Sequence, residues 1–241
     1  MIAITGATGN IGSKITSDLL SKGQHVRCIA RTADNLQNFA AKGAEIAAIS
    51  LDDTDALAKE LTGVDAFFAM IPPHYQAQDF RAYQNAIGTS IASAIEAAGV
   101  KYVINLSSQG ADLTEKTGPI KGLRDQEQRL NKINDVNILH LRPTYFMENL
   151  LANIDMIKQM NIMGSAIRGD MKIPMIATQD IAKFSAERLL KKDFSGITVN
   201  DLIGQKDLSM NEALVRVLFK STNQPLSPIP TQMTFVFDGL C

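Results

Sequence analysis

Short apolar runs alternate along most of the chain with longer stretches in which apolar residues recur at helical spacing. Buried parallel strands joined by crossover helices produce this alternation, so we predict a doubly wound α/β fold built on one parallel sheet. The predicted strands are Ile2–Thr5, His25–Ala30, Ala44–Ser50, Ala66–Met70, Tyr102–Leu106, Asn137–Leu141 and Thr198–Leu202. The predicted helices are Ile11–Lys22, Asp34–Lys42, Thr54–Leu61, Tyr83–Ala98, Leu123–Ile133, Met147–Met160, Gln179–Leu190 and Ser209–Leu218.

The alternation of apolar runs and helical stretches becomes less regular after about residue 143, although no linker or low-complexity tract interrupts the chain. We therefore predict one α/β domain over residues 1–218, whose small C-terminal substrate-side region comes mainly from about residue 143 onward. Residues 219–241 are predicted to be an atypical tail. Within that tail, "TFVF" at Thr234–Phe237 is either an added edge strand or an exposed apolar end that favours self-association.

Three glycines spaced three residues apart, Gly6, Gly9 and Gly12, lie in the stretch "AITGATGNIGS". They follow the first predicted strand and open the first predicted helix. At such a turn the missing side chains let the backbone approach a pyrophosphate, and the free N–H groups of the helix face the anion. Because the turn lies inside one strand–helix–strand unit, it predicts dinucleotide binding rather than a merely flexible connection.

The residue that ends the second strand indicates which dinucleotide is bound. An NAD site carries Asp or Glu there for the ribose 2′-hydroxyl, whereas an arginine accommodates a 2′-phosphate. The sequence reads "VRCIART", which places Arg31 at this position, and Asp34 is interpreted as the N-cap of the next helix. We therefore expect NADP(H) to be preferred over NAD(H), with a solvated strand-end charge as the alternative role of Arg31.

Two further strand ends carry candidate residues. Asp52 or Asp53, after the third strand, is suited to accept from the adenine amino group, yet both are also ordinary helix-capping residues. The fourth strand ends in "AMIPPH", where two prolines turn the chain outward at the carboxyl edge of the sheet. His74 in this loop is interpreted as a solvated bystander rather than a catalyst.

Composition and charge narrow the classes of function. The 241 residues carry 24 Lys+Arg against 25 Asp+Glu, with no dense basic run, so nucleic acid is not an expected partner. The two cysteines, Cys28 and Cys241, are too few for a disulfide framework or a metal-ligand cluster, and no metal site is predicted. The sequence shows no signal peptide and no run of eighteen apolar residues, so we expect a cytoplasmic protein that contacts no membrane.

Four motifs together resemble the NmrA-like branch of the atypical short-chain dehydrogenase/reductases, which have a Rossmann fold. They are "TGATGNIG" at Thr5–Gly12, Arg31 after the second strand, "NLSSQGAD" at Asn105–Asp112 and "LRPTYFMENLL" at Leu141–Leu151. The resemblance implies NAD(P) binding, commonly of NADP(H). Some members of that branch reduce quinones, dyes or other small organic acceptors, and others sense the redox state of the cofactor without turnover.

Carried onto this chain, the resemblance assigns three groups of cofactor-binding residues. The pyrophosphate is assigned to Gly6, Thr8, Gly9, Asn10, Ile11 and Gly12. The 2′-phosphate is assigned to Arg31. The nicotinamide end is assigned to Ile71, Pro72, Tyr145 and Phe146. Asp52 and Ser107, which follow the third and fifth predicted strands, are further candidate cofactor-binding residues.

The catalytic pattern of the wider superfamily is incomplete in this chain. Ordinary members use Ser, Tyr and Lys, and the lysine, four residues after the tyrosine, lowers the tyrosine pKa for proton exchange. Ser107 and Ser108 stand where the serine is expected, but Thr117 takes the place of the tyrosine four residues before Lys121. Lys121 is the candidate catalytic residue, polarising a substrate oxygen, with an exposed loop lysine as the alternative interpretation.

Two functions follow from these observations. The first is an NADP(H)-dependent oxidoreductase that passes hydride to a small organic acceptor such as a quinone or dye. Hydride transfer to such an acceptor needs no acidic group of the protein. The second is a non-catalytic regulator that senses the cofactor and signals to a protein partner. The expected partners are thus a small-molecule acceptor and either a second copy of the chain or a regulatory protein.

Overall fold

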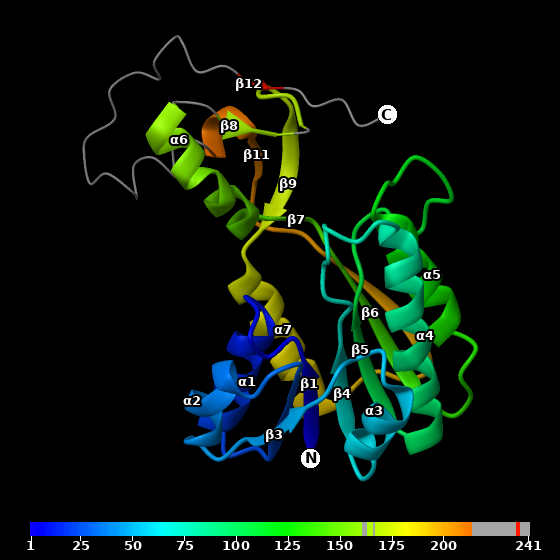
Figure 1. Ribbon diagram of the computed structural model, residues 1–241. Helices are drawn as coiled ribbons and strands as arrows, with labels where there is room; N and C mark the ends of the chain where they lie inside the picture. The colour runs from blue at the N-terminus through cyan, green and yellow to red at the C-terminus, as the bar shows by residue number, and fades with distance from the viewer. Residues whose placement is uncertain (161–162, 166, 214–234, 237–241) are drawn as a thin grey trace. The chain divides into compact units, whose positions relative to one another are not determined.

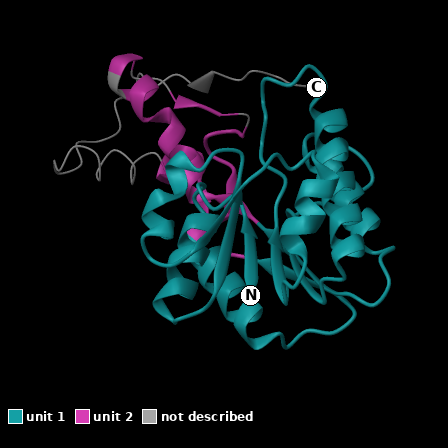
Figure 2. Cartoon of the chain, turned by 60° about the horizontal axis from the view of Figure 1, so that its bottom comes forward, with its two compact units in different colours: residues 1–143, 179–202 teal, residues 144–178, 203–241 magenta. Residues whose placement is uncertain are grey.

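The computed structural model describes residues 1–160, 163–165, 167–213 and 235–236. The chain divides into two compact units, which are coloured separately in Figure 2. The first comprises Met1–Pro143 and Gln179–Leu202, and the second comprises Thr144–Thr178 and Ile203–Cys241.

The first unit is built on a parallel sheet of seven strands, which confirms the predicted fold class. The strands are β1 (Ile2–Thr5), β2 (Val26–Ala30), β3 (Glu45–Ala48), β4 (Ala66–Ala69), β5 (Tyr102–Leu106), β6 (Asn137–Pro143) and β10 (Ile197–Leu202). Their order across the sheet is β10-β6-β5-β4-β1-β2-β3, so the direction of chain progress reverses between β1 and β4. In doubly wound folds, ligands bind at the carboxyl ends of the strands at this reversal.

Helices cover both faces of this sheet because its strands are apolar on both sides. In Figure 1, α1, α2 and α7 lie on one face, whereas α3, α4 and α5 lie on the other. Their bounds are α1 Gly12–Ser21, α2 Gln37–Ala40, α3 Thr54–Leu61, α4 Phe80–Ala98, α5 Ile120–Leu130 and α7 Thr178–Lys191. Phe67 and Phe68 of β4 are both fully buried and belong to the core between these layers. None of the helices within the described ranges is both long and apolar enough to cross a bilayer.

Three helix starts differ by three residues from the prediction, since α2 begins at Gln37, α4 at Phe80 and α5 at Ile120. The α4 helix begins at Phe80 rather than Tyr83, since the Asp79 carboxylate accepts a hydrogen bond from Ala82 N at 2.8 Å. The interpretation of Asp34 as an N-cap is wrong. Asp34 lies inside a 3₁₀ turn, Asp34–Leu36, whose N-cap position is Ala33 and which has no side-chain cap.

A single buried hydroxyl links the ends of β1 and β4, where the strand order reverses. Thr5 is fully buried, and its Oγ1 donates to the Phe68 carbonyl at 2.9 Å. The same oxygen accepts a hydrogen bond from Met70 N at 2.9 Å. The side chain thereby extends the β1–β4 pairing beyond its last backbone register, Ile4 with Phe68.

The second unit contains small sheets that the sequence pattern did not predict. Strands β7 (Tyr145–Phe146), β9 (Lys172–Ile176) and β11 (Asp207–Ser209) form one sheet, and β8 (Met163–Gly164) pairs with β12 (Phe235–Val236). The helix predicted over Met147–Met160 is instead a 3₁₀ helix, Met147–Asn153, followed by α6, Ile154–Met160. The unit has its own apolar cluster of Leu150, Ile157, Met163, Met175, Leu208, Met210 and Ala213.

The C-terminal expectations fall largely outside the described residues. The helix predicted over Ser209–Leu218 begins at Met210 and can be followed to Ala213. Residues 219–234 and 237–241 of the predicted tail are not described. Phe235–Val236, the central pair of "TFVF", pairs in parallel with Met163–Gly164.

Replacing Thr5 with valine tests the link between β1 and β4. Thr5→Val keeps the shape but leaves the Phe68 carbonyl and Met70 N–H without their partner, so we expect a loss of about 1–3 kcal/mol in the free energy of unfolding. Thr16→Val is the matched control, because Thr16 is also fully buried but its hydroxyl has only a 3.8 Å contact with Cys28 Sγ. Urea unfolding measures both variants, and equal losses would contradict the assigned role of Thr5.

Candidate functional site

The glycine turn after β1 is held closed by a backbone contact that only glycine permits. A Cβ atom on Gly12 would lie 2.2 Å from the Gly6 carbonyl oxygen. Gly6 itself has φ +66°, and a Cβ there would lie 2.7 Å from Met70 Sδ. The turn therefore packs against the end of β4, at the reversal of strand order. Gly9 is exposed, and its added Cβ would meet only the Gly6 carbonyl oxygen, at 3.3 Å.

The start of α1 presents unpaired hydrogen-bond donors. Gly9 N donates to the Gly6 carbonyl at 2.9 Å, but the amides of Asn10, Ile11 and Gly12 have no acceptor among the residues described. The helix has no side-chain N-cap and no acidic residue in its first turn. Free amides and the positive end of the helix dipole attract an anion. The turn thus fits a pyrophosphate, with the exposed Thr8 and Asn10 side chains beside it.

Arg31 directly follows β2 at the same edge of the sheet. Its side chain is exposed, and the guanidinium forms no ion pair with any residue that the structure describes. Arg27 on the same strand differs, because it pairs with Glu45 at 2.6 Å and with Glu60 at 3.5 Å. Arg31 is therefore a cation without a carboxylate partner in the described chain, which suits it to a phosphate.

The two aspartates after β3 have different roles. The Asp53 carboxylate accepts a hydrogen bond from Ala56 N at 3.0 Å and caps α3. Asp52 is exposed and takes no part in the cap. Of the two alternatives that the sequence left open, capping accounts for Asp53, and Asp52 keeps its assignment as a candidate for the adenosine end.

The residues after β4 and β5 line the same edge. Ile71 is buried and Pro72 is half-buried, directly after β4. Ser107 follows β5, where its backbone N donates to the Leu141 carbonyl at 2.8 Å. The Ser107 side chain is only 3% exposed, yet its Oγ has no hydrogen-bond partner within the described ranges. A buried hydroxyl without a partner is unusual, and Ser107 is one of five described side chains with such a buried polar atom.

Beneath Ser107 lies an ion pair that sequence reasoning missed. Glu127 of α5 accepts two hydrogen bonds from the Arg142 guanidinium of β6, at 3.0 and 2.6 Å. Burial alone would raise the pKa of Glu127, but the Arg142 hydrogen bonds and the nearby Ser107 hydroxyl bring it below its ordinary value. Ser107 Oγ lies beside this carboxylate without reaching the geometry of a hydrogen bond. The Glu127 carboxyl therefore stays ionised at neutral pH.

His140 of β6 is a second buried group near this edge. Its Nε2 lies 2.8 Å from Asn131 Oδ1, and its Nδ1 lies 3.1 Å from Asn105 Nδ2. Because an amide oxygen only accepts, Nε2 carries the proton and Nδ1 accepts from Asn105. Burial lowers the pKa of His140 to about 4, against the opposing effect of the Glu127 carboxylate. The imidazole is thus neutral at pH 7.

The remaining candidates are not joined to Ser107 by described contacts. Lys121 lies in the first turn of α5 and is half-buried, and no hydrogen bond or ion pair of its ammonium group is found in the described part of the chain. The Thr117 hydroxyl, four residues earlier, is buried without a hydrogen-bond partner there. Tyr145 and Phe146 form β7 of the second unit, in register with Met175 and Ile176 of β9.

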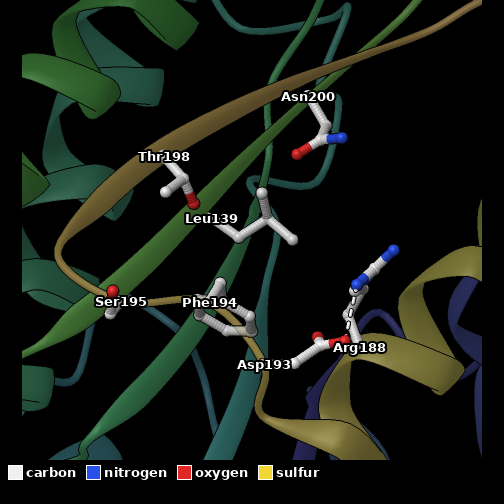
Figure 3. Close-up of a pocket in the computed structure, with 7 residues that line it drawn as sticks. All are labelled: Leu139, Arg188, Asp193, Phe194, Ser195, Thr198 and Asn200. Carbon is white, nitrogen blue, oxygen red and sulfur yellow. Dashed lines mark hydrogen bonds and ion pairs between the residues drawn. The ribbon is translucent and has the colours of Figure 1, made fainter.

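A hollow of about 360 Å³ lies elsewhere in the first unit (Figure 3). Its lining residues are Leu139, Arg188, Asp193, Phe194, Ser195, Thr198 and Asn200. Arg188 is paired with Asp193 at 2.7 Å, so its charge is already neutralised. Leu139 and Thr198 lie near the amino ends of β6 and β10, so this hollow is separate from the candidate dinucleotide site. Within the described ranges, no cluster of three or more His, Cys, Asp or Glu side chains is arranged to hold a metal ion.

Comparison with known proteins places these features in one family. The sequence profile of the NmrA-like family matches residues 1–230. Quinone oxidoreductase 2 of Escherichia coli is 28% identical over 229 residues, which cover 93% of this chain and 76% of that protein. A (4-alkanoyl-5-oxo-2,5-dihydrofuran-3-yl)methyl phosphate reductase of Streptomyces griseus is 27% identical over 189 residues, 78% of this chain. The match spans only 63% of the Streptomyces protein.

Solved structures show the same fold. The NADPH complex of an NADPH-dependent quinone oxidoreductase from Escherichia coli has a TM-score of 0.78 at 24% identity, covering 98% of this chain and 78% of that chain. A triphenylmethane reductase from Citrobacter sp., complexed with NADP(H), has a TM-score of 0.77 at 19% identity, covering 94% and 79% of the two chains.

The low pKa of His140 makes stability depend on pH. The unfolded histidine binds a proton near its ordinary pKa of 6.5, whereas the folded one does so only near 4, so unfolding is favoured as the pH falls through this window. That difference corresponds to about 3 kcal/mol at most. We expect His140→Gln to flatten the decline in unfolding free energy between pH 6.5 and 4.5.

His25→Gln is the matched control, because His25 is exposed. Urea unfolding at several pH values gives the slopes, and His25→Gln should keep that of the unsubstituted chain. If His140→Gln keeps the same slope, the linkage assigned to His140 is wrong.

Proposed function

The chain belongs to the NmrA-like family, and from that membership we propose that it is an NADP(H)-binding oxidoreductase. The proposed reaction transfers hydride from the nicotinamide to a small organic acceptor such as a quinone or a dye. The observation that carries the proposal is the β1–α1 turn, in which the Gly12–Gly6 contact leaves the amides of the helix start without acceptors in the described chain. The Escherichia coli relative is named a quinone oxidoreductase, which agrees with this acceptor class.

The adenosine end of the cofactor is assigned to the ends of β2 and β3. In this proposal Arg31 binds the 2′-phosphate, because its guanidinium is exposed and has no ion-pair partner in the described chain. Asp52 is assigned to the adenine amino group, since Asp53 already caps α3. The pyrophosphate is assigned to Gly6, Thr8, Gly9, Asn10, Ile11 and Gly12.

The nicotinamide end is assigned to the ends of β4 and β5. Ile71 and Pro72 would bound the ribose, and the buried Ser107 hydroxyl would bind either the cofactor's carboxamide or the acceptor. Tyr145 and Phe146 keep the assignment to the nicotinamide that the family resemblance gives them. When bound, the cofactor supplies the hydride, and the protein contributes position and shielding from water.

The buried titratable groups near Ser107 fit an acceptor that takes its proton from water. Glu127 is ionised and held by Arg142, so it has no proton to give at neutral pH. His140 is neutral, and its single N–H already donates a hydrogen bond to Asn131 Oδ1. Thr117 cannot replace the missing tyrosine, because an aliphatic hydroxyl is too weak an acid. Lys121 would then act only as a positive charge toward the acceptor oxygen.

The second candidate function is a regulator that binds the cofactor without turnover. The observation that favours it is the pair Thr117 and Lys121, which stands where an active dehydrogenase has tyrosine and lysine. A regulator would keep the glycine turn and Arg31 but would need no acceptor site at Ser107. The two functions therefore differ in acceptor-dependent turnover and not in cofactor binding.

Substitution of Arg31 tests the assignment of the 2′-phosphate. We expect Arg31→Ala to weaken NADP⁺ binding by about tenfold or more, because a charge-assisted contact to phosphate is lost, and to leave NAD⁺ binding nearly unchanged. Lys42→Ala removes the same charge from an exposed residue in the turn after α2 and serves as control. Calorimetric titration measures both affinities, and equal losses for NADP⁺ and NAD⁺ would refute the assignment.

A turnover assay separates the two candidate functions. We expect the purified chain to oxidise NADPH in the presence of quinones or triphenylmethane dyes, seen as loss of absorbance of the reduced nicotinamide. Unactivated ketones should give no such loss, because their reduction needs a protein acid. If the chain binds NADPH but no quinone or dye in the panel accelerates its oxidation, the regulator is the better description.

A further inference from the structure

Tyr83 lies in the first turn of α4, at the carboxyl edge of the sheet. Its backbone N donates to the Asp79 carbonyl at 3.0 Å, which fixes the residue in the helix. The half-buried ring packs against the core of the first unit and meets the His74 ring edge-on, with centroids 5.2 Å apart. Tyr83 is thereby held against the loop that follows β4.

The packing of α4 against α3 shows that Tyr83 lies on the face of α4 that contacts the start of α3. Thr54 Oγ1, at the start of α3, donates to Ser90 Oγ of α4 at 3.0 Å. Tyr83 and Ser90 are seven residues apart and so lie on the same face of the helix. Tyr83 therefore lies about 10 Å from Ser90 along the helix axis, in the direction of the carboxyl edge of the sheet. Asp52 precedes α3 at this edge.

Two charged side chains from neighbouring strand ends act on the Tyr83 hydroxyl. Burial raises the pKa of Tyr83, the positive charge of Arg31 lowers it, and the negative charge of Asp52 raises it. The net effect is upward, so the phenol keeps its proton at neutral pH. Its oxygen has no hydrogen-bond partner among the residues described. A protonated hydroxyl thus lies within electrostatic reach of the ends of both β2 and β3.

We propose that Tyr83 is a binding residue for the adenosine 2′-phosphate of NADP(H), its hydroxyl donating a hydrogen bond to the phosphate that Arg31 neutralises. The inference rests on the proposed function and adds a residue that the sequence motifs do not include. A hydrogen bond donated to a phosphate dianion is charge-assisted, and it is therefore stronger than one donated to a ribose hydroxyl. Tyr83 would therefore favour NADP(H) over NAD(H).

The alternative role is that the Tyr83 ring forms only a wall for adenine. In that case the ring matters equally for both dinucleotides, and the hydroxyl matters for neither. The two roles are separated by removing the oxygen and keeping the ring, and by using ligands that differ only in the 2′-phosphate.

The experiment is calorimetric titration of the full chain with adenosine 2′,5′-bisphosphate and with AMP, which lacks only the 2′-phosphate. For Tyr83→Phe we expect about tenfold weaker binding of the bisphosphate, the loss of one hydrogen bond to a charged group, and an unchanged affinity for AMP. Tyr75→Phe is the matched control, because Tyr75 is 82% exposed and stacks on Phe80. It should leave both affinities unchanged. In the double variant with Arg31→Ala, the Tyr83 effect should shrink, since both residues serve one phosphate.

Each result has a distinct meaning. If Tyr83→Phe binds the bisphosphate as well as the unsubstituted chain does, or loses AMP affinity in equal measure, the role of Tyr83 is wrong while the proposed function stands. If the unsubstituted chain binds the bisphosphate no better than AMP, the preference for NADP(H) fails, and the role of Tyr83 fails with it. A selective loss that is confined to Tyr83→Phe supports the proposal.

Discussion

The contact between Gly12 and the Gly6 carbonyl is the constraint on which the candidate site depends. With no room for a Cβ atom between them, the start of α1 lies directly on the turn that leaves β1. The amides of residues 10–12 have no acceptor among the residues described, and the first turn of the helix has no side-chain cap. The Thr5 hydroxyl completes the arrangement by tying the end of β1 to β4. Arg31, Asp52 and Ser107 then follow strands whose ends are fixed relative to this turn.

Much of the first unit could be predicted from the sequence because its signals are local. Buried parallel strands read as apolar runs, and all seven were located, with ends that differ by a few residues. Helix starts were less certain, since a carboxylate can serve as a cap or as part of a turn. Asp79 caps α4 and Asp53 caps α3, whereas Asp34 caps nothing. In the described part of the second unit, four of the five strands have only two or three residues, too few for a period to emerge, and β9 has five.

The candidate site could be predicted from the sequence where it consists of a backbone turn and an exposed charged side chain. It could not be predicted where it depends on which side chains become buried together. The glycine spacing and Arg31 can be recognised directly in the amino-acid sequence. The Glu127–Arg142 pair joins α5 to β6 across 15 residues and is visible only once the helix packs on the sheet. The neutral state of His140 likewise follows from its complete burial and its two amide neighbours. Sequence reasoning assigned no role to Glu127 or to Tyr83.

The division of the chain has a consequence for folding. Each unit is assembled from two separate segments, so the backbone passes between the units three times, after Pro143, Thr178 and Leu202. Ile197 of β10 pairs with Ile138 of β6, although the first segment of the second unit lies between them in the sequence. Closing that long loop costs chain entropy before the edge strand is gained, which slows assembly of the sheet. A chain cut after Pro143 would lose β10 and leave the edge of β6 bare, so the first unit cannot be isolated by simple truncation.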